Sequence, residues 1–131
     1  MKIYDCFIYF DEDVLLDVRF NILDKFVDKF VIVESKYSHS GKSRKPNFNI
    51  NNFKKYEKKI EYILLEKDPE EIFQINENDP KISDKIIINA NLREFFQRNA
   101  ITRGLSEASE NDIILISDVD EIPNLENIDF K

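Results

Sequence analysis

Three acidic side chains lie close together late in the sequence, directly after an apolar segment. Asp118, Asp120 and Glu121 follow residues 113–116, all of which are Ile or Leu. Two carboxylates that flank a single residue can bind one hard divalent cation, and the phosphates of a substrate can supply further oxygen ligands. Without a cation, the clustered negative charges would repel one another. The pattern favours a metal site over its alternative, an acidic turn that is simply hydrated.

Two charged side chains elsewhere could contact a ligand beside that metal. Arg98 precedes the apolar segment, and a guanidinium can donate two charge-assisted hydrogen bonds to a diphosphate. The alternative for Arg98 is a surface pair with Glu94, four residues earlier on the same predicted helix. Glu34 ends another apolar segment, where its carboxylate either accepts hydrogen bonds from a ribose or base or is exposed to water.

Three further residues have side-chain chemistry but no evident partner. Arg19 falls within the apolar stripe of a predicted helix, so if buried it needs a carboxylate that the sequence does not identify. Its alternative is to extend to the surface along its aliphatic stem. His39 stands in a polar segment of a chain with 1 His, which indicates a surface loop. Cys6 lies within a predicted strand, which indicates an inert core thiol.

The elements that must position these residues alternate between strands and helices. The predicted strands are residues 3–10, 30–33, 60–65 and 113–116, with an extra edge strand at 86–88; helices are predicted after residues 11–13 and at 53–59 and 91–108; residues 35–52 and 68–85 are predicted to be mostly loops. Apolar strands separated by helices imply an α/β fold whose mostly parallel sheet is covered on both faces. Ligands bind such sheets beyond the carboxyl ends of the strands, where Glu34, Asp118 and Asp120 would lie.

Two of the predicted helices carry apolar patterns that indicate what they cover. Leu15, Val18, Ile22 and Phe26 recur at helical spacing and predict one buried stripe on the first helix. The helix at 91–108 has apolar residues on nearly opposite sides, which indicates a helix packed between two surfaces.

Composition limits the classes of protein to which the chain can belong. A length of 131 residues predicts a single domain, and a net charge of −7 argues against a nucleic-acid partner. The single cysteine cannot form an internal disulfide, which favours a reducing compartment. Asp5 interrupts the apolar core that a signal peptide needs, and no apolar run approaches the roughly 20 residues that span a membrane. These features predict a soluble, cytoplasmic protein.

Five segments that occur together and in order resemble glycosyltransferase family 17. The segments are Asp5–Phe7, Val27–Glu34, Ser40–Lys42, Arg93–Ala100 and Ile114–Pro123. Because they span nearly the whole chain, the resemblance is far more specific than two aspartates separated by one residue.

The resemblance implies a GT-A-like (Rossmann-like) fold and a metal-dependent transfer with inversion. The donor would be a nucleotide sugar, with UDP-N-acetylglucosamine favoured, and the acceptor a glycan of the N-linked type. Asp118 and Asp120 would bind Mn²⁺ or Mg²⁺ against the diphosphate. Arg98 and Asp118 would contact the nucleotide sugar, and Phe7 and Glu34 would cradle the nucleoside.

The chain also departs from the family pattern. Family catalytic domains continue beyond the aspartate motif, so residues 1–131 are expected to form one donor-binding domain, with the general base beyond Lys131. The lack of a membrane anchor favours a bacterial or viral setting, and an exposed sheet edge would favour a homodimer. Two alternatives remain open: a non-catalytic half-domain that binds nucleotide sugars, and a haloacid-dehalogenase-like phosphatase with Asp118 as nucleophile.

Overall fold

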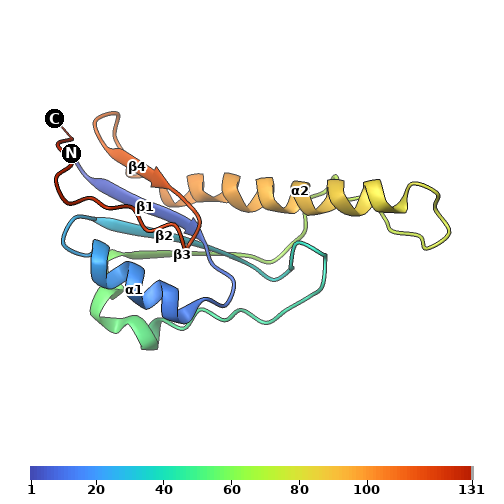
Figure 1. Cartoon of the computed structure of the whole chain (residues 1–131), viewed down its shortest axis with the longest axis horizontal. Helices are drawn as coiled ribbons and strands as arrows, with labels where there is room; N and C mark the ends of the chain where they lie inside the picture. The colour runs from blue at the N-terminus through green and yellow to red at the C-terminus, as the bar shows by residue number, and fades with distance from the viewer. Residues whose placement is uncertain (131) are drawn as a thin grey trace.

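Residues 1–130 are described by a computed structural model, in which four parallel strands form one sheet (Figure 1). Lys131, the last residue of the predicted domain, lies outside the described residues. The elements in chain order are β1 (Ile3–Ile8), α1 (Asp13–Leu23), β2 (Lys29–Ser35), the 3-10 segment η1 (Ile50–Lys59), β3 (Ile60–Leu65), α2 (Ile82–Ala100), the 3-10 turn η2 (Ile101–Gly104) and β4 (Ile113–Ile116). The strand order is β3-β2-β1-β4, which confirms the predicted α/β, Rossmann-like class with its parallel sheet.

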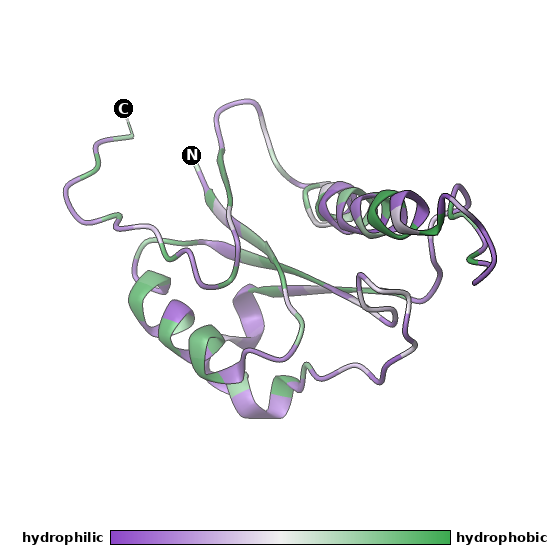
Figure 2. Ribbon diagram, turned by 45° about the vertical axis from the view of Figure 1, so that its right-hand side comes forward, coloured by the Kyte–Doolittle hydropathy of each residue, from purple (hydrophilic) through white to green (hydrophobic). Residues whose placement is uncertain are grey.

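The two faces of the sheet pack against different helices, and each face has its own apolar core. Alternate residues of a strand point to opposite faces, so that Phe7 packs toward α1 and η1 whereas Cys6 packs toward α2 and η2. Figures 1 and 2 show α1 and α2 on opposite sides of the strands. This arrangement confirms that helices cover both faces of the sheet.

Helix α1 buries a different face from the predicted one. The residues that lie in the core are Leu16, Arg19, Phe20 and Leu23. Of the predicted stripe, Leu15, Val18 and Ile22 are instead 37%, 41% and 45% exposed, whereas Phe26, beyond the end of the helix, is partly buried against the core. Apolar residues occur around much of this helix (Figure 2), so their spacing alone does not select a face. Phe20 does select it, because its ring contacts the rings of Phe7, Phe30, Phe53 and Tyr56.

Helix α2 differs from prediction in its bounds and in the character of its buried side. The isoleucines at 86–88 belong to this helix, so the predicted edge strand is wrong, and the helix ends at Ala100 instead of Ala108. Its N-terminal part extends past the strands (Figure 1), where the sheet offers no pairing partner for 86–88. The buried residues of α2 include Asn89, Arg93 and Gln97, because this side packs on polar loops; the predicted packing of two apolar sides is therefore wrong. None of the helices formed by residues 1–130 is long and apolar enough to cross a membrane.

The buried position of Cys6 predicts a slow thiol reaction. Burial, and to a lesser extent the neighbouring Asp5, raises the pKa of the Cys6 thiol from 9.0 to about 12. Near neutral pH the thiolate population should fall about a thousandfold, because each unit of pKa changes it tenfold. We expect a thiol-specific chromogenic reagent to label the native protein at least that much more slowly than the denatured chain. Similar labelling rates for the two states would contradict the buried position.

Candidate functional site

A pocket of about 550 Å³ lies at the carboxyl edge of the sheet. Its walls come from the ends of β1 and β2, from α2, and from the loop that follows β4. Among the residues that line it are Phe10, Tyr37, Arg44, Arg98 and Asp118, together with Asp120. This is the edge at which open parallel sheets bind ligands. The structure thus brings Arg98, Asp118 and Asp120 together as the sequence predicted.

Arg98 joins α2 to the acidic loop. One terminal nitrogen of its guanidinium, Nη2, lies 2.8 Å from Oδ1 of Asp118 and 3.1 Å from Oε1 of Glu94. The hydrogen bond with Asp118 is the main cause that raises the pKa of Arg98, with Glu94 contributing further. The predicted surface pair with Glu94 is present, but the same guanidinium also faces the pocket.

The chemistry of Asp118 and Asp120 fits a divalent cation that shares its ligands with a substrate. Both aspartates line the pocket, and the Asp118 side chain is 55% exposed. Among residues 1–130, no group of three or more His, Cys, Asp or Glu side chains is arranged to hold a metal ion. A cation of the Mg²⁺ type is commonly bound by one or two carboxylates, with substrate phosphates and water completing its coordination. The two carboxylates are enough for that mode of binding, though not for an all-protein site.

The acidic loop rests on a fully buried ion pair. Arg19 and Asp5 are both 0% exposed, and the guanidinium contacts both carboxylate oxygens, with Nε 2.7 Å from Oδ2 and Nη2 2.6 Å from Oδ1. Asp5 is therefore the carboxylate that the sequence did not identify, and the alternative that Arg19 extends to the surface is wrong. The inner face of the acidic loop, residues 117–121, contacts the same guanidinium.

Phe7 is placed inside the protein and not at the pocket. Its side chain is 0% exposed, and its ring lies beneath the Arg19 guanidinium, 4.6 Å from ring centroid to Cζ. It also packs against Phe20 in the core below α1. Its position gives no support to the predicted contact with a nucleoside.

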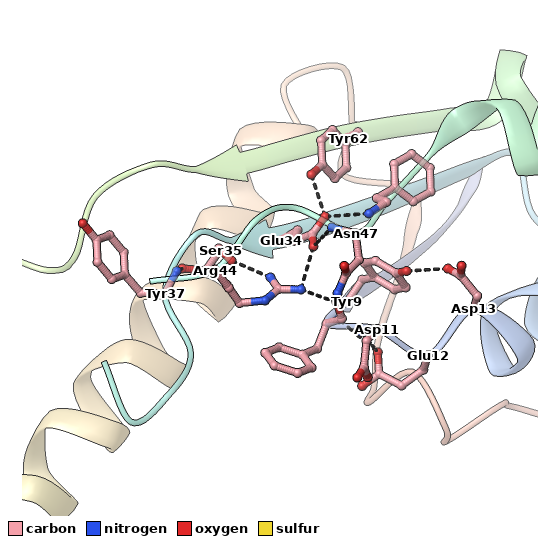
Figure 3. Close-up of polar contacts among 12 residues, drawn as sticks. Tyr9, Asp11, Glu12, Asp13, Glu34, Ser35, Tyr37, Arg44, Asn47 and Tyr62 are labelled. Atoms are coloured by element: carbon pink, nitrogen blue, oxygen red, sulfur yellow. Dashed lines mark hydrogen bonds and ion pairs between the residues drawn. The ribbon is translucent and has the colours of Figure 1, made fainter. Parts of the chain in front are cut away.

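Glu34 is buried at the end of β2 and held by four partners (Figure 3). Its Oε1 accepts hydrogen bonds from the Tyr62 hydroxyl at 2.7 Å and from the main-chain nitrogen of Phe48 at 3.1 Å. Its Oε2 accepts one from the main-chain nitrogen of Asn47 at 2.7 Å and pairs with Arg44 at 2.9 Å. The alternative of a hydrated carboxylate is wrong. A ligand could reach Glu34 only by replacing one of these partners.

The structure assigns Arg44 a position that sequence reasoning missed. Its guanidinium pairs with Glu34 and donates to the carbonyl oxygen of Ser35 (Figure 3). It also donates to the carbonyl oxygen of Phe10, and its Cζ lies 4.1 Å from the centroid of the Phe10 ring. Arg44 also lines the pocket. In the sequence it is one of several cations in a polar segment, with no spacing that distinguishes it from its neighbours.

His39 is exposed, as predicted for a loop, but it also forms part of the pocket wall. Its Nε2 lies 3.4 Å from Oε1 of Gln97, and its carbonyl oxygen accepts a hydrogen bond from Arg93 at 3.1 Å. Gly41 in the same loop has φ +88°, and a Cβ there would lie 2.6 Å from Nη2 of Arg93. The loop is therefore fastened to α2, so that His39 and Gln97 face the same pocket as Arg98.

Comparison of the sequence with known proteins identifies a family of enzymes that the chain matches. The model of glycosyltransferase family 17 matches residues 1–131. A human and a rat protein, both named beta-1,4-mannosyl-glycoprotein 4-beta-N-acetylglucosaminyltransferase, are 32% identical to the chain over 120 residues. The match covers 88% of this chain but 21% and 20% of the two proteins, so the chain spans about a fifth of the length of these relatives. No solved structure matches the chain.

The contact between Tyr62 and Glu34 predicts a loss of stability at alkaline pH. Burial, and then the hydrogen bond to Glu34, raises the pKa of Tyr62. Because the folded state binds this proton more tightly than the unfolded state, the stabilisation is complete below about pH 10 and is lost as the pH rises further. Urea unfolding should therefore show a steeper fall in stability from about pH 10 to about pH 11 for the native sequence than for Tyr62→Phe. Parallel pH profiles for the two proteins would contradict the contact.

Proposed function

The chain belongs to glycosyltransferase family 17, and on this premise we propose that it forms the donor-binding part of a metal-dependent glycosyltransferase. The observation that carries the proposal is the convergence of Arg98, Asp118 and Asp120 on one pocket at the carboxyl edge of the sheet. A cation, two carboxylates and a nearby guanidinium are the groups that a nucleoside diphosphate requires.

The proposed donor is UDP-N-acetylglucosamine, and the proposed acceptor is a mannose-containing glycan. The names of the human and rat relatives specify this sugar and this class of acceptor, which supports the same choice here. Transfer is proposed to invert the anomeric carbon. Donor binding is assigned to residues 1–130, whereas no residue among them is assigned as the general base.

The side chains at the pocket have distinct proposed roles. Asp118 and Asp120 would hold Mn²⁺ or Mg²⁺, which when bound stabilises negative charge on the departing nucleoside diphosphate. Arg98 would donate hydrogen bonds to the diphosphate, and it is already held at the pocket by Glu94. A cation bound by Asp118 would compete with Arg98 for this carboxylate, and weakening of that ion pair would leave the guanidinium more available to phosphate.

Two further parts of the proposal concern the setting of the protein. β3 and β4 are the outer strands of the sheet, and Ile116 on β4 is 55% exposed. Exposed sheet edges favour association, which supports a proposed homodimer. The proposed cytoplasmic location rests on the single cysteine, which is a free and buried thiol.

Metal-dependent nucleotide binding is the direct test of this function. Calorimetric titration of the full chain with UDP should show clear binding with Mn²⁺ and much weaker binding without it. Asp120→Asn should remove most of the gain from Mn²⁺, because a neutral amide is a poorer ligand for a hard cation. Asp17→Asn, an exposed acid on α1 that does not line the pocket, is the matched control and should bind as the native sequence does.

That titration, together with assays of sugar transfer and of phosphate-ester turnover, separates the competing functions. Equal UDP binding with and without Mn²⁺, or an unchanged gain in Asp120→Asn, would contradict the metal site. Metal-dependent binding without transfer to a mannose-containing glycan would favour the non-catalytic half-domain. Turnover of generic phosphate esters would instead favour the phosphatase.

The assignment of Arg98 to the diphosphate can be tested by changing the ligand. Arg98→Gln should weaken UDP binding by roughly 10- to 100-fold, since a hydrogen bond to a charged group contributes about 1.5–3 kcal/mol. It should leave the binding of uridine, which has no phosphate, nearly unchanged. Arg103→Gln, which alters an exposed arginine on η2, is the control for loss of positive charge. An equal loss for UDP and uridine would show that Arg98 acts on the fold of the pocket instead.

A further inference from the structure

The guanidinium of Arg19 contacts the acidic loop at four oxygen atoms from beneath. Its Nη1 donates to the carbonyl oxygens of Asp118 at 2.7 Å, Val119 at 3.2 Å and Glu121 at 3.1 Å. Its Nη2 donates to the Ser117 hydroxyl at 2.6 Å. We propose that Arg19 is a positioning residue that sets the directions of the Asp118 and Asp120 carboxylates for the cation, an inference that rests on the proposed function.

All the donor capacity of Arg19 is divided between one anchor and this loop. An arginine carries five N–H donors in a rigid planar fork. The edge formed by Nε and Nη2 binds Asp5 on β1, and the remaining donors of Nη2 and Nη1 point to residues 117–121. The loop is thereby fixed relative to β1, the strand that pairs with β4.

The loop has little internal structure that could fix its shape without Arg19. The main-chain nitrogen of Glu121 donates to the carbonyl of Asp118 at 2.9 Å, and the Ser117 hydroxyl donates to the carbonyl of Glu121 at 2.9 Å. Val119 is 6% exposed and packs into the core below α1, whereas Asp118 and Asp120 on either side of it are exposed. A carbonyl that rotates away from Arg19 would turn the adjoining carboxylate as well, because both belong to the same short stretch of backbone.

Stability alone does not account for an arginine at this place. Replacing a buried ion pair by apolar residues of similar volume is often neutral or stabilising, since the desolvation of both charges is avoided. Lysine would carry the same charge, but its single nitrogen lacks the planar fork that serves Asp5 on one edge and several carbonyls on the other. The planar fork of Arg19 is therefore suited to holding a ligand-binding loop in place.

A paired substitution tests this role without leaving a charge buried alone. In Arg19→Met combined with Asp5→Leu, both charges are removed and the core volume is largely kept. Ser117→Ala is a milder second variant, which removes one contact to Arg19 and the hydrogen bond to Glu121. Val27→Ala trims a buried residue that precedes β2, far along the sheet from the acidic loop, and controls for a general loss of stability.

The readout is the ratio of UDP affinities measured with and without Mn²⁺ in the folded full-length chains. Residues that orient metal ligands typically change metal affinity by about 10–100-fold, so the paired variant should lose that much of the gain from Mn²⁺, and Ser117→Ala a smaller part. Binding of UDP without metal should change much less, because neither Arg19 nor Asp5 lines the pocket and both are replaced together. A role in folding alone would lower both affinities together, as is expected for Val27→Ala if it acts at all. An unchanged ratio in the folded paired variant would overturn the proposal.

Hydrogen exchange separates failure of this inference from failure of the proposed function. The main-chain amide of Glu121 donates to the carbonyl of Asp118, and it should exchange faster in the paired variant and in Ser117→Ala. The amides of β1 and β2 should keep their protection in both. If the native sequence binds no metal–nucleotide, the proposed function fails, and with it the role of Arg19 toward a cation. If the native sequence binds and loop protection is unchanged in the paired variant, only the positioning role is refuted.

Discussion

The ion pair between Arg19 and Asp5 is the interaction on which the arrangement of the site depends. Both partners are fully buried, so each charge requires the other, and removing one alone would cost about 3–5 kcal/mol. The pair also helps to determine which side of α1 faces the sheet, because Arg19 can reach Asp5 on β1 only when Leu16, Phe20 and Leu23 point into the core. Together with the rings around Phe20 it fixes the rotation of α1, and Arg19 also supplies donors to the loop after β4.

The sheet was predictable from sequence, whereas the helix faces were not. The segments near 3–10, 30–33, 60–65 and 113–116 are mostly apolar, and this pattern is enough to predict strands of a covered parallel sheet. In α1, apolar residues occur on several sides, so the buried face was decided by an aromatic cluster and by a carboxylate 14 residues earlier in the chain. In α2, the isoleucines at 86–88 favour a strand by type, but they lie where the sheet has already ended.

In the candidate site, too, some positions could be predicted from the sequence and others could not. The positions of Asp118, Asp120 and Arg98 followed from local features, namely a strand end and the helix that precedes it. Glu34 also ends a strand, yet the segment that contains Arg44, Asn47 and Phe48 folds back over it and uses its oxygens. Burial of a charged side chain by a later loop leaves no mark in the spacing of the sequence. Such residues are found only when the loop itself is placed.

Electrostatics of the pocket favour the joint binding of a cation and an anion. Arg98 and Asp118 pair in the structure, so under the proposed function a diphosphate bound alone would compete with Asp118 for the guanidinium, and a cation bound alone would compete with Arg98 for the carboxylate. With both ligands bound, Arg98 would face the diphosphate and Asp118 the cation, so each of these two charges would keep an opposite partner. Under the proposed function each ligand would therefore raise the affinity for the other, and by the same factor, as linkage requires. The contacts of Arg19 to the carbonyl oxygens of Asp118, Val119 and Glu121 would hold the backbone of the loop in place while the Asp118 carboxylate exchanges Arg98 for the cation.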